Sequence, residues 1–153
     1  IGEVHVSKIY GLHKALIFSS AAHRKACRSE FQRLNLSDGQ PKVLSVLVEN
    51  EGYLQKDLAK RCHVEPATMT SILANMSKNG LVRKEIEHVS GGKRAFAIYL
   101  TDKGREIAEQ VNEIVQSAEE KAYEGFSDEE KRLIVACLTR LGENLVAASE
   151  LSE

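Results

Sequence analysis

The residues best suited to bind another molecule lie in one segment, 64-VEPATMTSILANMSKNG-80. Met69, Leu73 and Met76 recur at helical spacing and predict one apolar face. The opposite face carries short polar side chains, including Thr68, Thr70, Ser71, Asn75 and Lys78. Side chains this short let a helix backbone approach a partner closely, and they can hydrogen-bond to nucleic-acid base edges or phosphates. Taken alone, such a face is also typical of an ordinary surface helix.

A basic β-hairpin is predicted directly after this helix. Residues 82–89 are extended and charged, residues 90–93 read as a turn, and Phe96, Ile98 and Leu100 alternate as in a half-buried strand. The hairpin and its tip carry four cations: Arg83, Lys84, Lys93 and Arg94. A basic hairpin tip can lie along a DNA minor groove, where arginine is favoured by the negative potential.

A shorter helix is predicted just before this one, and it must hold the longer helix in place. Residues 54–60 predict a short helix, and Arg61-Cys62-His63 a tight connection. Two helices joined in this way resemble a helix-turn-helix, whose second helix enters the major groove. With the hairpin, the pattern predicts a winged helix. Its expected DNA contacts are Thr68, Thr70, Ser71, Asn75, Lys78, Lys93 and Arg94.

Long helices are predicted on both sides of this region. An apolar stripe predicts a helix over 4–34, and a second apolar face follows a possible capping box of Ser37 and Gln40. After the hairpin, one helix runs from Thr101-Asp102 to about residue 124. A capping box of Ser127 and Glu130 begins the last helix, whose apolar residues show a heptad-like spacing. The predicted fold is therefore mainly α, with a small β-hairpin wing.

The distribution of charge supports a nucleic-acid partner more than the overall balance does. The chain of 153 residues has a net charge of −1, yet residues 55–105 hold ten Lys or Arg and five Asp or Glu. No apolar run approaches the ~20 residues of a membrane span. With no secretory signal apparent and three widely spaced cysteines, we expect a cytoplasmic protein without disulfides.

Catalytic and metal-binding patterns are weak. His23 and Cys27 share a helical face, but a metal needs further ligands, so packing is the better interpretation. Cys62 and Cys137 are expected in the core. The sequence shows no nucleophile–base pattern, phosphate loop or paired Cys-x-x-Cys motif. We therefore expect neither an enzyme nor a cofactor.

Residues 36–104 carry a family resemblance. Gly80-Leu81-Val82 leads from the second helix into the wing, and Leu100-Thr101-Asp102-Lys103-Gly104 follows it. The chain resembles the MarR family of bacterial winged-helix transcription regulators in these motifs and in its flanking long helices. The family commonly has an acidic residue two positions before the wing arginine. Here that position is Gly92, so the resemblance implies that Arg94 is held less rigidly.

The resemblance implies a homodimer in which residues 1–34 and 102–153 form the helical dimerisation region and residues 36–101 the winged helix-turn-helix. Two recognition helices would then bind an inverted-repeat operator with half-sites ~34–36 Å apart. Regulators of this family are typically repressors that small, often phenolic, ligands or oxidants release from DNA. Two alternatives stay open: a winged helix used for protein contact, and a thiol- or oxidant-responsive variant of the same regulator.

Overall fold

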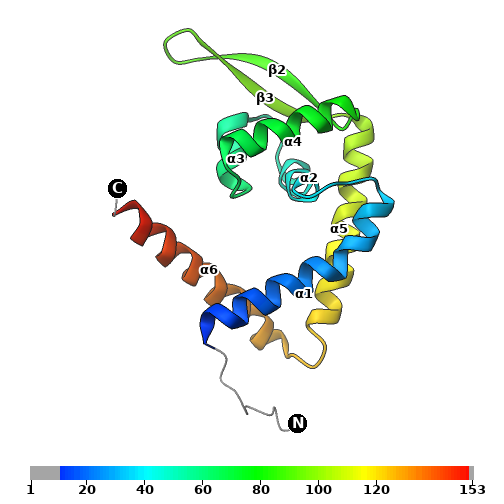
Figure 1. Cartoon of the computed structure of the whole chain (residues 1–153), viewed down its shortest axis with the longest axis vertical. Coiled ribbons are helices and arrows are strands. Elements are labelled where there is room, and N and C mark those ends of the chain that lie inside the picture. The colour runs from blue at the N-terminus through cyan, green and yellow to red at the C-terminus, as the bar shows by residue number, and fades with distance from the viewer. Residues whose placement is uncertain (1–10, 152–153) are drawn as a thin grey trace. The chain divides into compact units, whose positions relative to one another are not determined.

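A computed structural model describes residues 11–151 of the chain. Its helices are α1 (Leu12–Arg33), α2 (Gln40–Glu49), α3 (Gln55–Arg61), α4 (Pro66–Lys78), α5 (Asp102–Ala122) and α6 (Asp128–Glu150). Its strands are β1 (Tyr53–Leu54), β2 (Val82–Val89) and β3 (Lys93–Leu100). The predicted fold class is confirmed: a mainly helical chain with a β-hairpin wing (Figure 1). The expected start of the first helix, at residue 4, lies outside the described residues.

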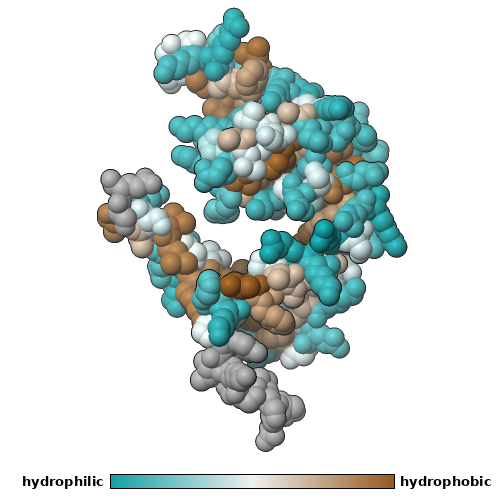
Figure 2. All heavy atoms as spheres, viewed as in Figure 1, coloured by the Kyte–Doolittle hydropathy of each residue, from teal (hydrophilic) through white to brown (hydrophobic). Residues whose placement is uncertain are grey.

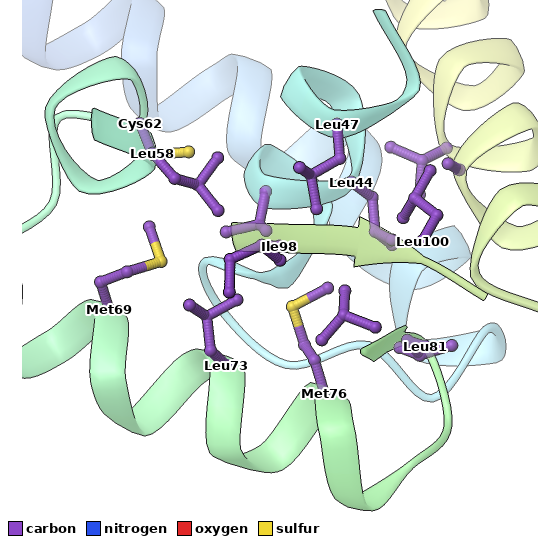
Figure 3. Close-up of a cluster of buried hydrophobic side chains, with 14 of the residues drawn as sticks. Leu44, Leu47, Leu58, Cys62, Met69, Leu73, Met76, Leu81, Ile98 and Leu100 are labelled. Carbon is purple, nitrogen blue, oxygen red and sulfur yellow. The ribbon is translucent and has the colours of Figure 1, made fainter. Parts of the chain in front are cut away.

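The core forms around the inward face of α4. Met69, Leu73 and Met76 are 0% exposed, and they point toward leucines of α2 and α3 and toward Ile98 of β3 (Figure 3). Burial of a side chain of this size contributes about 1.5–3 kcal/mol. The helix is thus held by its apolar face, and its outward side chains are left available for another molecule.

The sheet has the strand order β1-β3-β2, and both pairings are antiparallel. Strand β1 was not expected, because Leu54 was assigned to the following helix. Tyr53 pairs with Ile98 and Leu54 with Ala97, so β3 is the central strand at its carboxyl end. The expected alternation in β3 fails at Ala97, which was expected on the outward side but is 0% exposed. It is correct for Ile98 and Leu100, which are buried, but wrong for Phe96, which is 48% exposed. The reason is that the hairpin extends past the helices that cover its base (Figure 1).

The two motifs that flank the wing bind each other. The Thr101 N–H donates to the Leu81 carbonyl (3.1 Å), and the Thr101 hydroxyl donates to the Gly80 carbonyl (2.5 Å). Lys103 donates to the Asn79 carbonyl (3.0 Å). Gly104 packs so tightly that a Cβ there would lie 1.9 Å from the Leu81 oxygen. These contacts join the end of α4 to the start of α5.

One of the two predicted capping boxes forms completely. The Ser127 hydroxyl accepts from the Glu130 N–H, and the Glu130 carboxylate accepts from the Ser127 N–H. These hydrogen bonds lower the pKa of Glu130. The first box is half wrong: the Ser37 N–H donates to the Gln40 side chain, but the N-cap of α2 is Gly39. Gly39 has φ +87, and a Cβ there would approach Ile72 to 2.6 Å, so glycine is required.

The chain divides into two compact units, with the boundary between Ala118 and Glu119. The first unit includes α1 and α5 as far as Ala118, and Phe31, Leu34 and Val111 pack within the winged-helix core. In the second unit, α6 has no buried residue. Among the described residues, none of the helices combines the length and apolar character needed to cross a membrane.

Candidate nucleic-acid interface

The outward face of α4 carries polar side chains from its first turn to its last. Each predicted contact on this helix is exposed: Thr68, Thr70, Ser71, Asn75 and Lys78. The helix period places them opposite the buried Met69, Leu73 and Met76. The structure therefore brings these five side chains to one side of the molecule, as a contact surface for DNA requires.

Thr70 is held by the neighbouring helix. Its hydroxyl donates to the Pro66 carbonyl (3.0 Å) and accepts from the Gln55 side chain of α3 (2.9 Å). A hydroxyl has one proton and two lone pairs, so Thr70 in this state retains one acceptor site. It could accept from a base amino group without losing either bond. Sequence reasoning missed Gln55, since it becomes a neighbour of Thr70 only when α3 packs on α4.

Asn75 belongs to a polar network that extends into the core. Gln40 is 1% exposed, and its side-chain amide donates to Asn75 Oδ1 (3.0 Å). Asn79 donates to the same oxygen (2.8 Å). Both lone pairs of Asn75 Oδ1 are then in use. Bidentate recognition of adenine by asparagine needs this oxygen as an acceptor as well as the side-chain NH2 group as a donor. In this arrangement only the side-chain NH2 group of Asn75 can bind DNA, and only as a hydrogen-bond donor.

The wing presents Lys93 and Arg94 as exposed side chains beside the turn. Gly91 and Gly92 have φ +84 and +71, a conformation that disfavours other residues. The glycine at the position where the family commonly has an acid is therefore part of the turn geometry. Within the described part of the chain, Arg94 has no ion pair.

A basic hollow of about 440 Å³ lies where α3 meets the start of α4. Lys56, Lys60 and His63 line it, next to Glu65 and Pro66. Sequence reasoning did not single out Lys56 and Lys60, although their spacing places them one helical turn apart. Their position beside the outward face of α4 suits contacts to phosphate.

The cysteines differ in environment. Cys27 and Cys62 are 1% and 0% exposed, which confirms the packing interpretation of both. Burial raises the pKa of each thiol, and the Lys42 ammonium partly offsets this for Cys62. The expectation for Cys137 was wrong: it is only half-buried, because α6 has no core within the chain. Among the described residues no cluster of three potential metal ligands exists, and His23 is exposed.

The sequence model of the MarR family matches residues 36–90. The chain is also 33% identical over 117 residues to the HTH-type transcriptional repressor YetL of Bacillus subtilis (strain 168), a match that covers 75% of this chain and 69% of that protein. The chain belongs to the MarR family. It is a DNA-binding transcription regulator of this family, with a winged helix-turn-helix fold.

Other relatives agree with this assignment. The HTH-type transcriptional regulator TtmR of Methylorubrum extorquens (strain PA1) is 28% identical over 136 residues, which cover 88% of this chain and 68% of that protein. The solved structure of the transcriptional regulator PA3341 has a TM-score of 0.78 at 27% identity, covering 90% of this chain and 99% of that one. The solved structure of NadR in complex with 4-hydroxyphenylacetate has a TM-score of 0.74 at 25% identity, and the match covers 88% of this chain and 94% of that one.

Proposed function

We propose that this MarR-family regulator is a homodimeric, cytoplasmic repressor that binds an inverted-repeat operator and is released by a small phenolic ligand. The observation that carries the proposal is the polar outward face of α4 beside a basic wing. In the proposal Thr68, Thr70, Ser71 and the Asn75 amide contact bases or phosphates. Lys78, Lys93 and Arg94 contact the phosphates and the minor groove.

Exposed apolar side chains on the long helices support a homodimer. On α1, Leu16, Ile17 and Phe18 are 37%, 57% and 75% exposed. On α6, Leu138 and Leu145 are 49% and 61% exposed, and Figure 2 shows hydrophobic residues along this helix. Apolar residues repeated along a helix are typical of a surface covered by another helix. A second copy of the chain would cover both.

The repressor role and the ligand class rest on relatives. YetL is named a repressor, and NadR was solved with 4-hydroxyphenylacetate, a phenolic carboxylate. Release by a ligand requires only that the ligand prefer a conformation in which the two recognition helices no longer match successive major grooves. Cys27 and Cys62 are disfavoured as oxidant sensors, because both are buried and burial raises the pKa of each thiol.

The first test is selection of bound fragments from the genome of the source organism, with the mass of the purified protein measured in the same preparation. An enriched inverted repeat bound by a dimer is expected. A dimer that enriches no sequence would favour a winged helix used for protein contact, and a monomer would contradict the role given to α1 and α6.

The contacts are then tested on the selected operator. Arg94→Ala should weaken binding strongly while leaving the dimer intact, and unchanged affinity would refute the wing contact. Ser71→Ala should alter sequence preference more than affinity for unrelated DNA, with Ser77→Ala as a control on the same helix. An equal loss on all DNA would count against base readout by Ser71.

A further inference from the structure

The register of the wing divides its side chains into two faces. Cross-strand partners share a face, and neighbours along a strand lie on opposite faces. His88 pairs with Arg94 and Ile86 with Phe96. We name the exposed part of this side the arginine face: Lys84, Ile86, His88, Arg94 and Phe96; Val82, Ile98 and Leu100 share the side but are buried. The opposite side, the glutamate face, consists of Arg83, Glu85, Glu87, Val89, Lys93, Ala95, the buried Ala97 and Tyr99.

Three of the four charged groups on the glutamate face, Arg83, Glu85 and Glu87, bind partners on that same face. Arg83 forms an ion pair with Glu85 and lies 4.7 Å from the centre of the Tyr99 ring. The Tyr99 hydroxyl donates to Glu87 (3.3 Å). Because this face carries both carboxylates of the wing, phosphates brought against it would meet negative charge.

The arginine face has the opposite character. Lys84 and Arg94 are cations, His88 lies directly across from Arg94, and the five positions of this face include no carboxylate. Consecutive residues point to opposite sides, so Lys93 does not share this face with Arg94. The face that carries the wing arginine is therefore also the face that a DNA backbone can approach.

An exposed apolar pair lies in the middle of the arginine face. Ile86 and Phe96 are 55% and 48% exposed, and Lys84 Nζ lies 5.6 Å from the centre of the Phe96 ring. Figure 2 shows hydrophobic residues among hydrophilic ones on the wing. Adjacent exposed apolar residues mark a contact surface more often than isolated ones do. An apolar centre with cations on both sides fits a partner whose apolar surface is bordered by negative charge.

We propose that the wing contacts DNA with its arginine face, and that Ile86 and Phe96 pack against the deoxyribose rings of the minor-groove wall. Lys84 then binds a phosphate near the base of the wing, while Arg94, nearer the tip, enters the groove. Apolar side chains are commonly used against the minor groove, and sugars bordered by phosphates have the chemistry that this face matches. The inference rests on the proposed function: it adds Lys84, Ile86 and Phe96 to the contacts, and it assigns the contact at the wing tip to Arg94 in place of Lys93.

The decisive test compares one new carboxylate on each face. Ile86→Glu places it on the arginine face, and Ala95→Glu places it on the glutamate face with the same change in net charge. Affinity for the selected operator, measured by fluorescence anisotropy, should fall about tenfold or more for Ile86→Glu and about twofold or less for Ala95→Glu. Equal losses would overturn the inference, and a larger loss for Ala95→Glu would place the other face on DNA.

Milder variants test the two kinds of contact separately. Lys84→Ala should reduce the slope of log affinity against log salt by about one, and Lys84→Arg should restore it. Phe96→Ala should weaken binding several-fold, whereas Phe96→Leu should bind nearly as well as the wild type. If Phe96→Ala binds like the wild type, the apolar pair does not contact DNA and the inference fails.

Two controls keep these outcomes distinct. Thermal unfolding of each variant should stay close to that of the wild type, because Ile86, Ala95 and Phe96 lie outside the core cluster. Ala95→Glu places a carboxylate directly across from Glu87 and should lower the unfolding temperature slightly. A wild-type protein that selects no operator refutes the proposed function itself. A wild-type protein that binds its operator, together with equal losses for the two glutamate variants, refutes only the assignment of the face.

Discussion

Helices α4 and α6 both carry apolar residues at helical spacing, yet their environments in the chain differ. On α4, Met69, Leu73 and Met76 are completely buried within the winged-helix core. On α6, none of the residues is buried, and Leu138 and Leu145 are about half exposed or more. The comparison indicates that the winged-helix region completes its core within one chain. The last helix keeps an apolar surface that needs a partner.

The same contrast appears in the polar groups. The buried Gln40 side chain binds both Ser37 and Asn75, and none of the buried side-chain polar atoms in the described part of the chain lacks a partner. In α6 the hydroxyls of Thr139 and Ser149 bond only to carbonyls of their own helix. The polar side chains of the winged helix therefore link different elements to one another, whereas these hydroxyls of α6 bond only within their own helix.

The largest effect is expected at glycines in the two regions. Gly104→Ala places a Cβ 1.9 Å from the Leu81 carbonyl, and the required backbone shift should cost about 3 kcal/mol or more. Gly142→Ala in α6 meets nothing within 4 Å and should stabilise the helix by about 0.5–1 kcal/mol. Chemical denaturation measures both. A destabilising Gly142→Ala would mean that a partner chain packs on that glycine.

The second prediction concerns assembly. Leu138→Glu puts a charge on the apolar surface of α6 and should raise the dimer dissociation constant about 100-fold or more, because burying an unpaired carboxylate is costly. Glu143→Gln, an exposed change on the same helix, is the control. Mass measured over a range of concentrations gives the constant. A Leu138→Glu variant that remains as dimeric as the wild type would remove α6 from the interface.

A third prediction separates the two roles of Asn75. Asn75→Ala leaves the buried Gln40 amide without its acceptor and should destabilise the chain by about 1–3 kcal/mol. Asn75→Asp keeps an acceptor for Gln40 and Asn79, so most stability should be retained, but the new charge should weaken operator binding. Denaturation and DNA titration test the two effects. Equal stability of Asn75→Ala and the wild type would show that the network contributes little.

The smallest effect is expected at the cysteines. Cys137 should react with a thiol reagent in the folded protein, whereas Cys27 and Cys62 should react only on unfolding. Burial raises the pKa of both from 9.0. The folded protein keeps both thiols protonated at a pH where the unfolded chain has begun to lose these protons. The free energy of unfolding should therefore not depend on these two thiols below pH 9, and it should fall at higher pH as the unfolded thiols ionise. A slow reaction of Cys137 in the dimer, with a fast one in Leu138→Glu, would place this thiol under the partner chain.

Much of the secondary structure could be predicted because its signals are local. The helical period assigned the inward and outward faces of α4, and Ser127 with Glu130 identified the start of α6. Positive φ values at Gly80 and Gly125 explain why these glycines end their helices. The candidate contacts on α4 followed from the same period, since a residue's side of a helix depends on its spacing alone.

Features that depend on distant residues were missed or assigned wrongly. Strand β1 has two residues, too few for a period, and it exists because β3 lies beside it. Phe96 resembles Ile98 in the sequence pattern but lies beyond the helices that bury Ile98. Cys137 lies in an apolar run, yet α6 has no core to bury it within one chain.

The sequence by itself determined the order of the helices, the place of the wing and the polar face of α4, because each is encoded by neighbours along the chain. Only the tertiary structure decided which hydrogen bonds those polar groups already make. It showed Thr70 bound to Gln55 and Asn75 bound to Gln40, and it separated Lys93 from Arg94 onto opposite faces of the wing. Such pairings form between segments far apart in sequence, so their geometry exists only after the chain has packed.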